Sequence, residues 1–106
     1  MTLEILVEKR SKIRMELLEN FRKEIDMIDA ELVALFERRM DVVLQVAAFK
    51  KANQVEVLHQ NREQEILKRA QKRLQNKDYT ESLTEFLTMI MDLSKKLQKA
   101  LIHDEK

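Results

Sequence analysis

The chain has no glycine, no proline and no cysteine among its 106 residues. Without cysteine it can form neither disulfides nor cysteine metal sites, and it has no thiol nucleophile. Without glycine it cannot form the phosphate-binding loops of P-loop or dinucleotide-binding proteins, whose tight backbone needs that residue. Tight hairpins also favour glycine, whereas long helices need neither glycine nor proline. The missing residues therefore favour an all-α fold.

The charges are almost balanced, with 20 basic and 19 acidic residues and a formal net charge of +1. Nucleic-acid-binding proteins usually carry a basic excess, and the one tyrosine and four phenylalanines are too scattered to stack bases. No apolar run approaches membrane length, and the first 20 residues are too charged for a signal peptide. His59 and His103 lie far apart, without a cluster of carboxylates. We expect a cytoplasmic protein without a metal site, a nucleic-acid partner or a membrane partner.

One long, one short and one medium helix are expected where apolar residues recur at helical spacing, over about Leu17 to Ala52, Asn61 to Leu74 and Thr80 to Leu101. Thr80 is the expected N-cap of the third helix, and the connections are expected near 51–58 and 75–79. The first helix would span roughly 50 Å, which is too long to pack only against two shorter helices. Because one small domain buries a modest core, this length favours oligomerisation.

The first 20 residues also have amphipathic helical spacing, with Leu6, Ile13 and Leu17 on one side. They either extend the first helix or form a frayed tail. We therefore separate an N-terminal extension, residues 1–20, from a domain over residues 21–106.

Polar residues interrupt the apolar faces of the first and third helices. At about 100° per residue, Arg39 lies about 20° from Leu32 at the centre of the first stripe, and Lys50 lies almost on it. On the third helix Ser94 falls inside the apolar stripe, and Gln98 follows one turn later. A single inward cation is usually explained by snorkelling or by pairing with a carboxylate. Two cations, a serine and a glutamine instead predict a polar cavity suited to an anion.

The spacing of the cations limits what each can reach. Arg39 and Lys50 lie about three turns, or roughly 16 Å, apart, so their long side chains can converge on one small molecule. Arg22 precedes Arg39 by about 25 Å of helix and cannot readily reach the same cavity. It could reach the cavity of a partner subunit if two long helices cross antiparallel.

Five blocks follow one another along the chain: Phe21–Asp26 with Ile28 and Asp29, Leu35–Met40, Phe49–Lys50, Asn61–Glu65, and Met91–Ser94 followed by Gln98. In this order and spacing they resemble the all-helical chorismate mutases. The resemblance implies an intertwined helical homodimer that converts chorismate to prephenate in aromatic amino-acid biosynthesis. The reaction is an intramolecular pericyclic rearrangement, which needs no cofactor.

The resemblance also implies a role for each matching residue. Arg39 and Arg22 of the partner subunit would bind the two substrate carboxylates. Lys50 would bridge a carboxylate and the ether oxygen of the breaking bond, and Gln98 would hydrogen-bond that oxygen from the other side. Glu63 would hold the substrate hydroxyl. The expected catalytic residues are therefore Lys50, Gln98, Arg39 and Glu63.

Three further positions complete the substrate-binding set. Ser94 would assist a carboxylate, and Arg62 would support the site electrostatically. His59 stands where the family often has aspartate, and its backbone N–H is expected to contact the substrate hydroxyl.

Other interpretations stay open beside this one. Arg22 and Arg62 could be solvated surface charges, and Ser94 could bond back to the carbonyl of Ile90. An isochorismate pyruvate-lyase on the same fold would use similar cations but would have less need of Glu63. A helical regulatory module could have the fold without turnover. A coiled-coil adaptor fits less well, because polar residues interrupt the apolar pattern.

Overall fold

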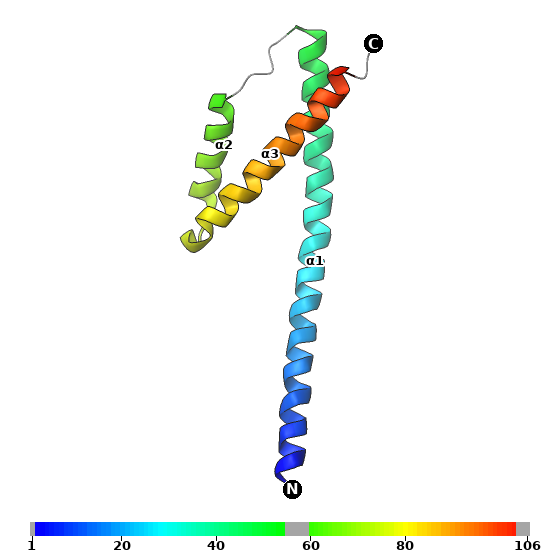
Figure 1. The fold of residues 1–106 in the computed structure, drawn as a ribbon, viewed down its shortest axis with the longest axis vertical. Helices are drawn as coiled ribbons and strands as arrows, with labels where there is room; N and C mark the ends of the chain where they lie inside the picture. The colour runs from blue at the N-terminus through cyan, green and yellow to red at the C-terminus, as the bar shows by residue number, and fades with distance from the viewer. Residues whose placement is uncertain (1, 55–59, 104–106) are drawn as a thin grey trace. The chain divides into compact units, whose positions relative to one another are not determined.

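The computed structural model describes residues 2–54 and 60–103, and in these ranges it contains helices and no strand (Figure 1). The elements are α1 (Leu3–Ala52), α2 (Gln60–Arg73), the short 3-10 helix η1 (Lys77–Tyr79) and α3 (Thr80–His103). The prediction of an all-α fold with one long, one short and one medium helix is confirmed. Because α1 begins at Leu3, the extension is helical and continues into the first helix.

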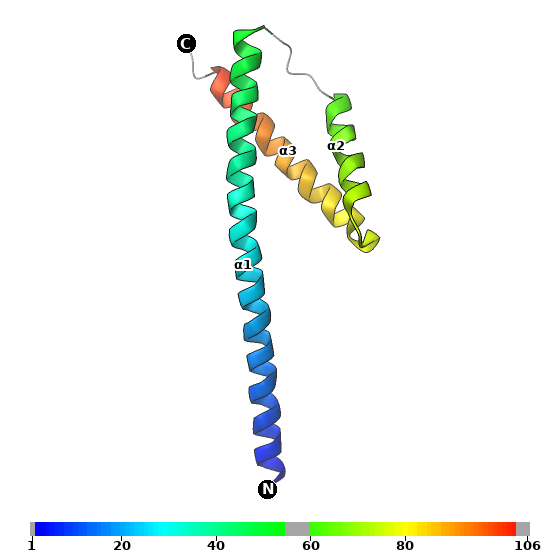
Figure 2. The ribbon, with the colours of Figure 1, turned by 180° about the vertical axis from the view of Figure 1, so that it is seen from behind.

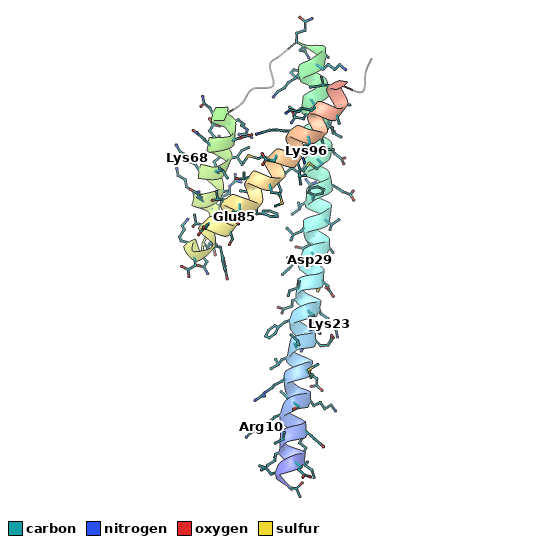
Figure 3. All side chains as sticks on the ribbon, in the orientation of Figure 1. Arg10, Lys23, Asp29, Lys68, Glu85 and Lys96 are labelled. Atoms are coloured by element: carbon teal, nitrogen blue, oxygen red, sulfur yellow. The ribbon has the colours of Figure 1, made fainter. Side chains whose placement is uncertain are left out.

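The chain divides into two compact units, residues 1–38 and residues 39–106. The first unit consists of the N-terminal part of α1, and every residue from 2 to 38 is exposed. Figure 3 labels Arg10, Lys23 and Asp29, whose side chains project from this part of α1. The exposed residues include the apolar stripe, whose large members are 42–57% exposed: Phe21, Ile25, Ile28, Leu32, Leu35 and Phe36. A lone helix cannot bury such a stripe by itself.

The second unit contains the end of α1 together with α2, η1 and α3. Its buried apolar side chains are Met40 and Ala47 of α1 and Met91 of α3. The small Ala47 side chain, 1% exposed, follows Met40 by two turns on the same side of α1. This face lies beside the stripe centred on Leu32, and Val46 of that stripe remains 40% exposed. The buried face of α1 within the chain is therefore rotated away from the centre predicted from periodicity.

Helices α2 and α3 form a hairpin (Figure 2), and local hydrogen bonds around η1 hold it. The Asn76 side chain caps η1 by accepting a hydrogen bond from the backbone N–H of Asp78 at 3.0 Å. Across the hairpin, the Gln71 amide donates to the Thr84 hydroxyl at 3.3 Å. The inner side of α2 carries half-buried residues expected from its spacing, Ile66, Leu67 and Ala70, and the half-buried Leu74 follows directly after the helix.

The expectation that Thr80 caps α3 as its N-cap is wrong. Thr80 already has helical angles, φ −57° and ψ −47°, and its hydroxyl donates to the carbonyl of Lys77 at 2.7 Å. An N-cap hydroxyl would instead accept a hydrogen bond from a backbone N–H further along the helix. The physical reason is that η1 runs directly into α3 and leaves no extended residue at that position.

Helix α1 ends without the glycine that usually follows a helix. Asn53 donates through its backbone N–H at 3.0 Å and its side-chain amide at 2.8 Å to the carbonyl of Phe49. Gln54 then takes the left-handed conformation, with φ 54°. A residue with a Cβ atom is strained in this region, by roughly 1 kcal/mol or more. Because the chain has no glycine, a residue with a Cβ atom has to adopt this conformation.

Replacing Gln54 by glycine should stabilise the protein, because glycine adopts a positive φ without that strain. We expect Gln54→Gly to raise the free energy of unfolding by about 0.5–1 kcal/mol, after the greater flexibility of glycine in the unfolded chain is subtracted. Urea denaturation measures the change. Gln54→Ala is the matched control and should give no such gain, since alanine keeps the Cβ atom; an equal gain from alanine would contradict the explanation.

Candidate functional site

Arg39 and Ser94, which the sequence predicts to face one cavity, are in direct contact. Arg39 Nη1 donates a hydrogen bond of 2.7 Å to Ser94 Oγ, which joins α1 to α3 across 55 residues of sequence. Ser94 is 6% exposed and Arg39 is half-buried. The two interrupted apolar faces therefore meet at their polar residues.

The Ser94 hydroxyl is held by three neighbours. Its oxygen accepts from Arg39, while its hydrogen is directed to the carbonyl of Ile90 at 2.8 Å. Met40 Sδ lies 3.7 Å away and is the weaker acceptor. The bond to Ile90 is the structural alternative considered for Ser94, and it coexists with the contact to Arg39. Ser94 thus fixes the direction of the Arg39 guanidinium.

Arg39 and Lys50 have no acidic partner among the described residues. Lys50, in the last turn of α1, is half-buried, and neither cation forms an ion pair with the residues described in 2–54 and 60–103. A guanidinium has five N–H donors, and one of them is engaged by Ser94. The remaining donors and the Lys50 ammonium can bind an anion. Burying part of a cation without a counter-ion is unfavourable, so the pair suits a ligand that carries negative charge.

Gln98 follows Ser94 by one turn of α3 and is half-buried. Its amide makes no hydrogen bond to the part of the chain that the structure describes. A half-buried amide in this position keeps both its donor and its acceptor for a ligand or water.

Glu63 lies in the first turn of α2 and faces α3. Its Oε1 lies 2.5 Å from the Nζ of Lys95, and its side chain is 34% exposed. The hydrogen bond that Lys95 donates to Glu63 is the largest cause that raises the pKa of Lys95 above the ordinary 10.5, and Asp92, 3.7 Å away, adds to it. The first-turn position is also favourable for a carboxylate, because the helix N-terminus is positive.

A hollow of about 250 Å³ separates α2 from α3 beside this ion pair. Of the predicted site residues it includes Glu63 alone. The full lining consists of Glu63, Gln64, Leu67, Thr88, Met91 and Asp92. Pockets that enclose a small ligand usually have about 300–1,000 Å³, so this hollow by itself does not enclose one.

The remaining predicted residues lie apart from these contacts or outside the described ranges. Arg62 is 54% exposed on its side chain and pairs with Glu65 at 3.8 Å, as a surface arginine does. Arg22 is exposed in the first unit. His59 lies outside the described residues. The single chain therefore brings Arg39 and Ser94 together, whereas the roles expected of the eight site residues stay predictions.

Lys95 is the residue that the sequence argument missed. The signal was present, because Asp92 and Lys95 are spaced i, i+3 on α3 and such residues are neighbours on a helix. The second partner, Glu63, comes from another helix, and spacing along one helix cannot reveal it.

Within the described residues, no group of three or more His, Asp or Glu side chains is arranged to hold a metal ion. None of the helices there has an apolar stretch that could cross a membrane.

The sequence model of one family, described as chorismate mutase type II, matches residues 21–99. The match covers well over half of the chain and spans every predicted site residue. The chain belongs to this chorismate mutase family. Membership supports a function of the chorismate mutase type in general, with chorismate as the implied substrate. No curated protein and no solved structure matches the chain.

The Lys95–Glu63 ion pair can be tested directly. Glu63→Gln removes the largest cause of the raised pKa, so the pKa of Lys95 should fall towards 10.5. Because the folded pKa is the higher one, any stabilisation by the pair is complete below pH 10.5 and is lost as the pH rises through the folded pKa. Titration of the lysine side-chain resonances by NMR measures the shift. An unchanged pKa of Lys95 in the Glu63→Gln variant would contradict the pairing.

Proposed function

We propose that this protein is a chorismate mutase that converts chorismate to prephenate as a homodimer. The observation that carries the proposal is the pair of half-buried cations, Arg39 and Lys50, which have no acidic partner among the described residues. Chorismate carries two carboxylates, and membership of the chorismate mutase family supports it as the substrate. The cytoplasm is the expected location of the reaction.

Binding would select the folded conformer of the substrate. Arg39, directed by Ser94, would hold one carboxylate, and Arg22 of the partner subunit would hold the other. Gripping both ends brings the two reacting arms together, which lowers the entropic part of the barrier. Arg62 would add positive potential at the edge of the site, and the His59 backbone N–H would contact the substrate hydroxyl.

The rearrangement itself would be assisted by charge rather than by proton transfer. As the bond between carbon and the ether oxygen breaks, negative charge grows on that oxygen. Lys50 and Gln98 would donate hydrogen bonds to it, and donors placed in advance stabilise such charge effectively. Substrate and product are isomers with the same number of hydrogen atoms, so no group has to gain or lose a proton. Glu63 would meanwhile accept a hydrogen bond from the substrate hydroxyl.

The proposed dimer follows from the exposed stripe of the first unit. Ile28, 54% exposed, and Leu32, 45% exposed, lie on the stripe that also includes Phe36. A second copy of α1 provides a stripe of the same shape and chemistry, and two identical chains most commonly associate around a twofold axis. If the two helices cross antiparallel, Arg22 of one subunit would lie near the substrate site of the partner subunit.

Purified protein mixed with chorismate tests the function, with ultraviolet absorbance to follow the substrate and chromatography to identify the product. Prephenate formed at an enzymatic rate would support the proposal. Pyruvate released from isochorismate, with no turnover of chorismate, would instead indicate a lyase on the same fold. A folded dimer that turns over neither substrate would indicate a binding or regulatory module.

Lys50→Ala should lower kcat far more than it raises KM, because the ammonium acts on charge that appears in the transition state. Loss of one such donor usually costs about 10²–10³-fold in kcat. Steady-state kinetics measure the two constants separately. Lys51→Ala, next to it at the exposed end of α1, is the matched control and should keep nearly full activity. Unchanged turnover in Lys50→Ala would refute the assignment.

Mixing two inactive variants tests whether each site uses both chains. Arg22→Ala and Arg39→Ala should each be nearly inactive alone. After unfolding together and refolding, half of the dimers should be mixed and should hold one intact site, so about a quarter of wild-type activity should return. Size-exclusion chromatography with light scattering shows that both variants are dimers. If no activity returns from well-formed mixed dimers, Arg22 acts in its own chain; an Arg22→Ala dimer that is active alone would show that Arg22 has no role.

A further inference from the structure

Lys95 stands between two acidic side chains at the wall of the hollow. Its Nζ lies 2.5 Å from Glu63 Oε1 and 3.7 Å from Asp92 Oδ1. Both acids line the hollow, Glu63 from α2 and Asp92 from α3. The ammonium therefore links the two walls at their charged residues, and nothing in the proposed mechanism yet uses it.

We infer that Lys95 is a positioning residue, which holds the Glu63 carboxylate in the orientation that receives the substrate hydroxyl. The inference rests on the proposed function, because it concerns how Glu63 meets that substrate. Lys95 itself would touch neither the substrate nor the reacting atoms.

The geometry of the ion pair leaves one carboxylate oxygen available. Lys95 engages Oε1, and no other residue in the described part of the chain bonds to Glu63. An ionised carboxylate offers about four acceptor positions on its two oxygens, so Oε2 can still accept a hydrogen bond. A glutamate side chain without a partner samples several rotamers, and holding it in one of them removes that freedom before substrate binds.

The charges favour the same role. The proposed substrate is a dianion, and Glu63 with Asp92 places two further negative charges at the hollow. The Lys95 ammonium offsets part of this charge at short range. Without it, the two carboxylates would repel an anionic ligand, and Glu63 would be free to turn towards solvent. Binding of the substrate should therefore weaken.

Stability is not where the ion pair should matter most. The Lys95 side chain is 48% exposed, and exposed ion pairs contribute little to the free energy of folding. Asp92 alone could serve as a helical neighbour of Lys95 on α3. Glu63 comes from another helix, so the contact with it fixes a relation between two elements. A functional readout is the suitable test.

Lys95→Met removes the charge and keeps most of the side-chain volume. We expect kcat/KM for chorismate to fall about tenfold, mainly through a higher KM, as is usual when a residue that orients a binding group is lost. Lys95→Arg keeps the cation and should stay within about threefold of wild type. Lys96→Met is the matched control, since Lys96 is exposed on the next position of α3 (Figure 3) and forms no ion pair with the described residues. The thermal unfolding midpoint should be the same in all variants.

A second background separates positioning from a general structural role. In Glu63→Gln, adding Lys95→Met should cause little further loss, because Lys95 would act through the Glu63 carboxylate. Equal kinetics of Lys95→Met and Lys96→Met, or a full further loss in the Glu63→Gln background, would overturn the inference while the mutase activity stands. Absence of turnover in the folded wild-type dimer would overturn the proposed function and this inference together.

Discussion

A helix of 50 residues carries an apolar stripe that its own chain does not cover. The exposure of this stripe is the constraint on which the remaining structure depends. Burying apolar surface is favourable, and large exposed apolar patches mark sites where a partner binds. At the end of α1, α3 packs against Met40, whose Sδ lies 3.7 Å from Ser94 Oγ. The stripe from Phe21 to Phe36 is exposed and is available to a second chain. In the proposed dimer, the surface that joins the subunits and the surface that carries Arg22 belong to one helix.

The second constraint is the way in which the charged side chains of the candidate site are oriented. The cations that face inwards on α1 are Arg39 and Lys50, and Arg39 is oriented by a buried serine rather than by a carboxylate. A carboxylate there would neutralise the guanidinium and compete with an anionic ligand. A hydroxyl fixes the direction of the group and leaves its charge intact. On α2, by contrast, a charged group is held by a group of opposite charge, since the carboxylate of Glu63 pairs with the Lys95 ammonium.

The sequence predicted the helices, because they follow from periodicity along the chain. It also placed Arg39 and Ser94 on the inward faces of two helices, and the structure brings these two residues into contact. Periodicity shows that α1 has an apolar stripe but not which neighbour covers which part of it, and within the chain the buried Met40 and Ala47 lie beside that stripe. Thr80 was misjudged as an N-cap because the 3-10 turn before it has no distinctive pattern. Lys95 escaped notice because its second partner, Glu63, lies on another helix. Contacts between helices depend on crossing geometry, which spacing along one helix does not contain.

The contacts within the second unit differ greatly in the length of chain that they close. The bond from Gln71 to Thr84 closes a loop of 13 residues, whereas the bond from Arg39 to Ser94 closes one of 55. The entropy lost on closing a loop grows with its length, and local contacts form faster. The hairpin of α2 and α3 is therefore expected to form early in folding, as a ready surface on which α1 docks. The arginine proposed to hold the substrate would be set in place late, so a chain with Arg39 correctly oriented is one that has already finished folding.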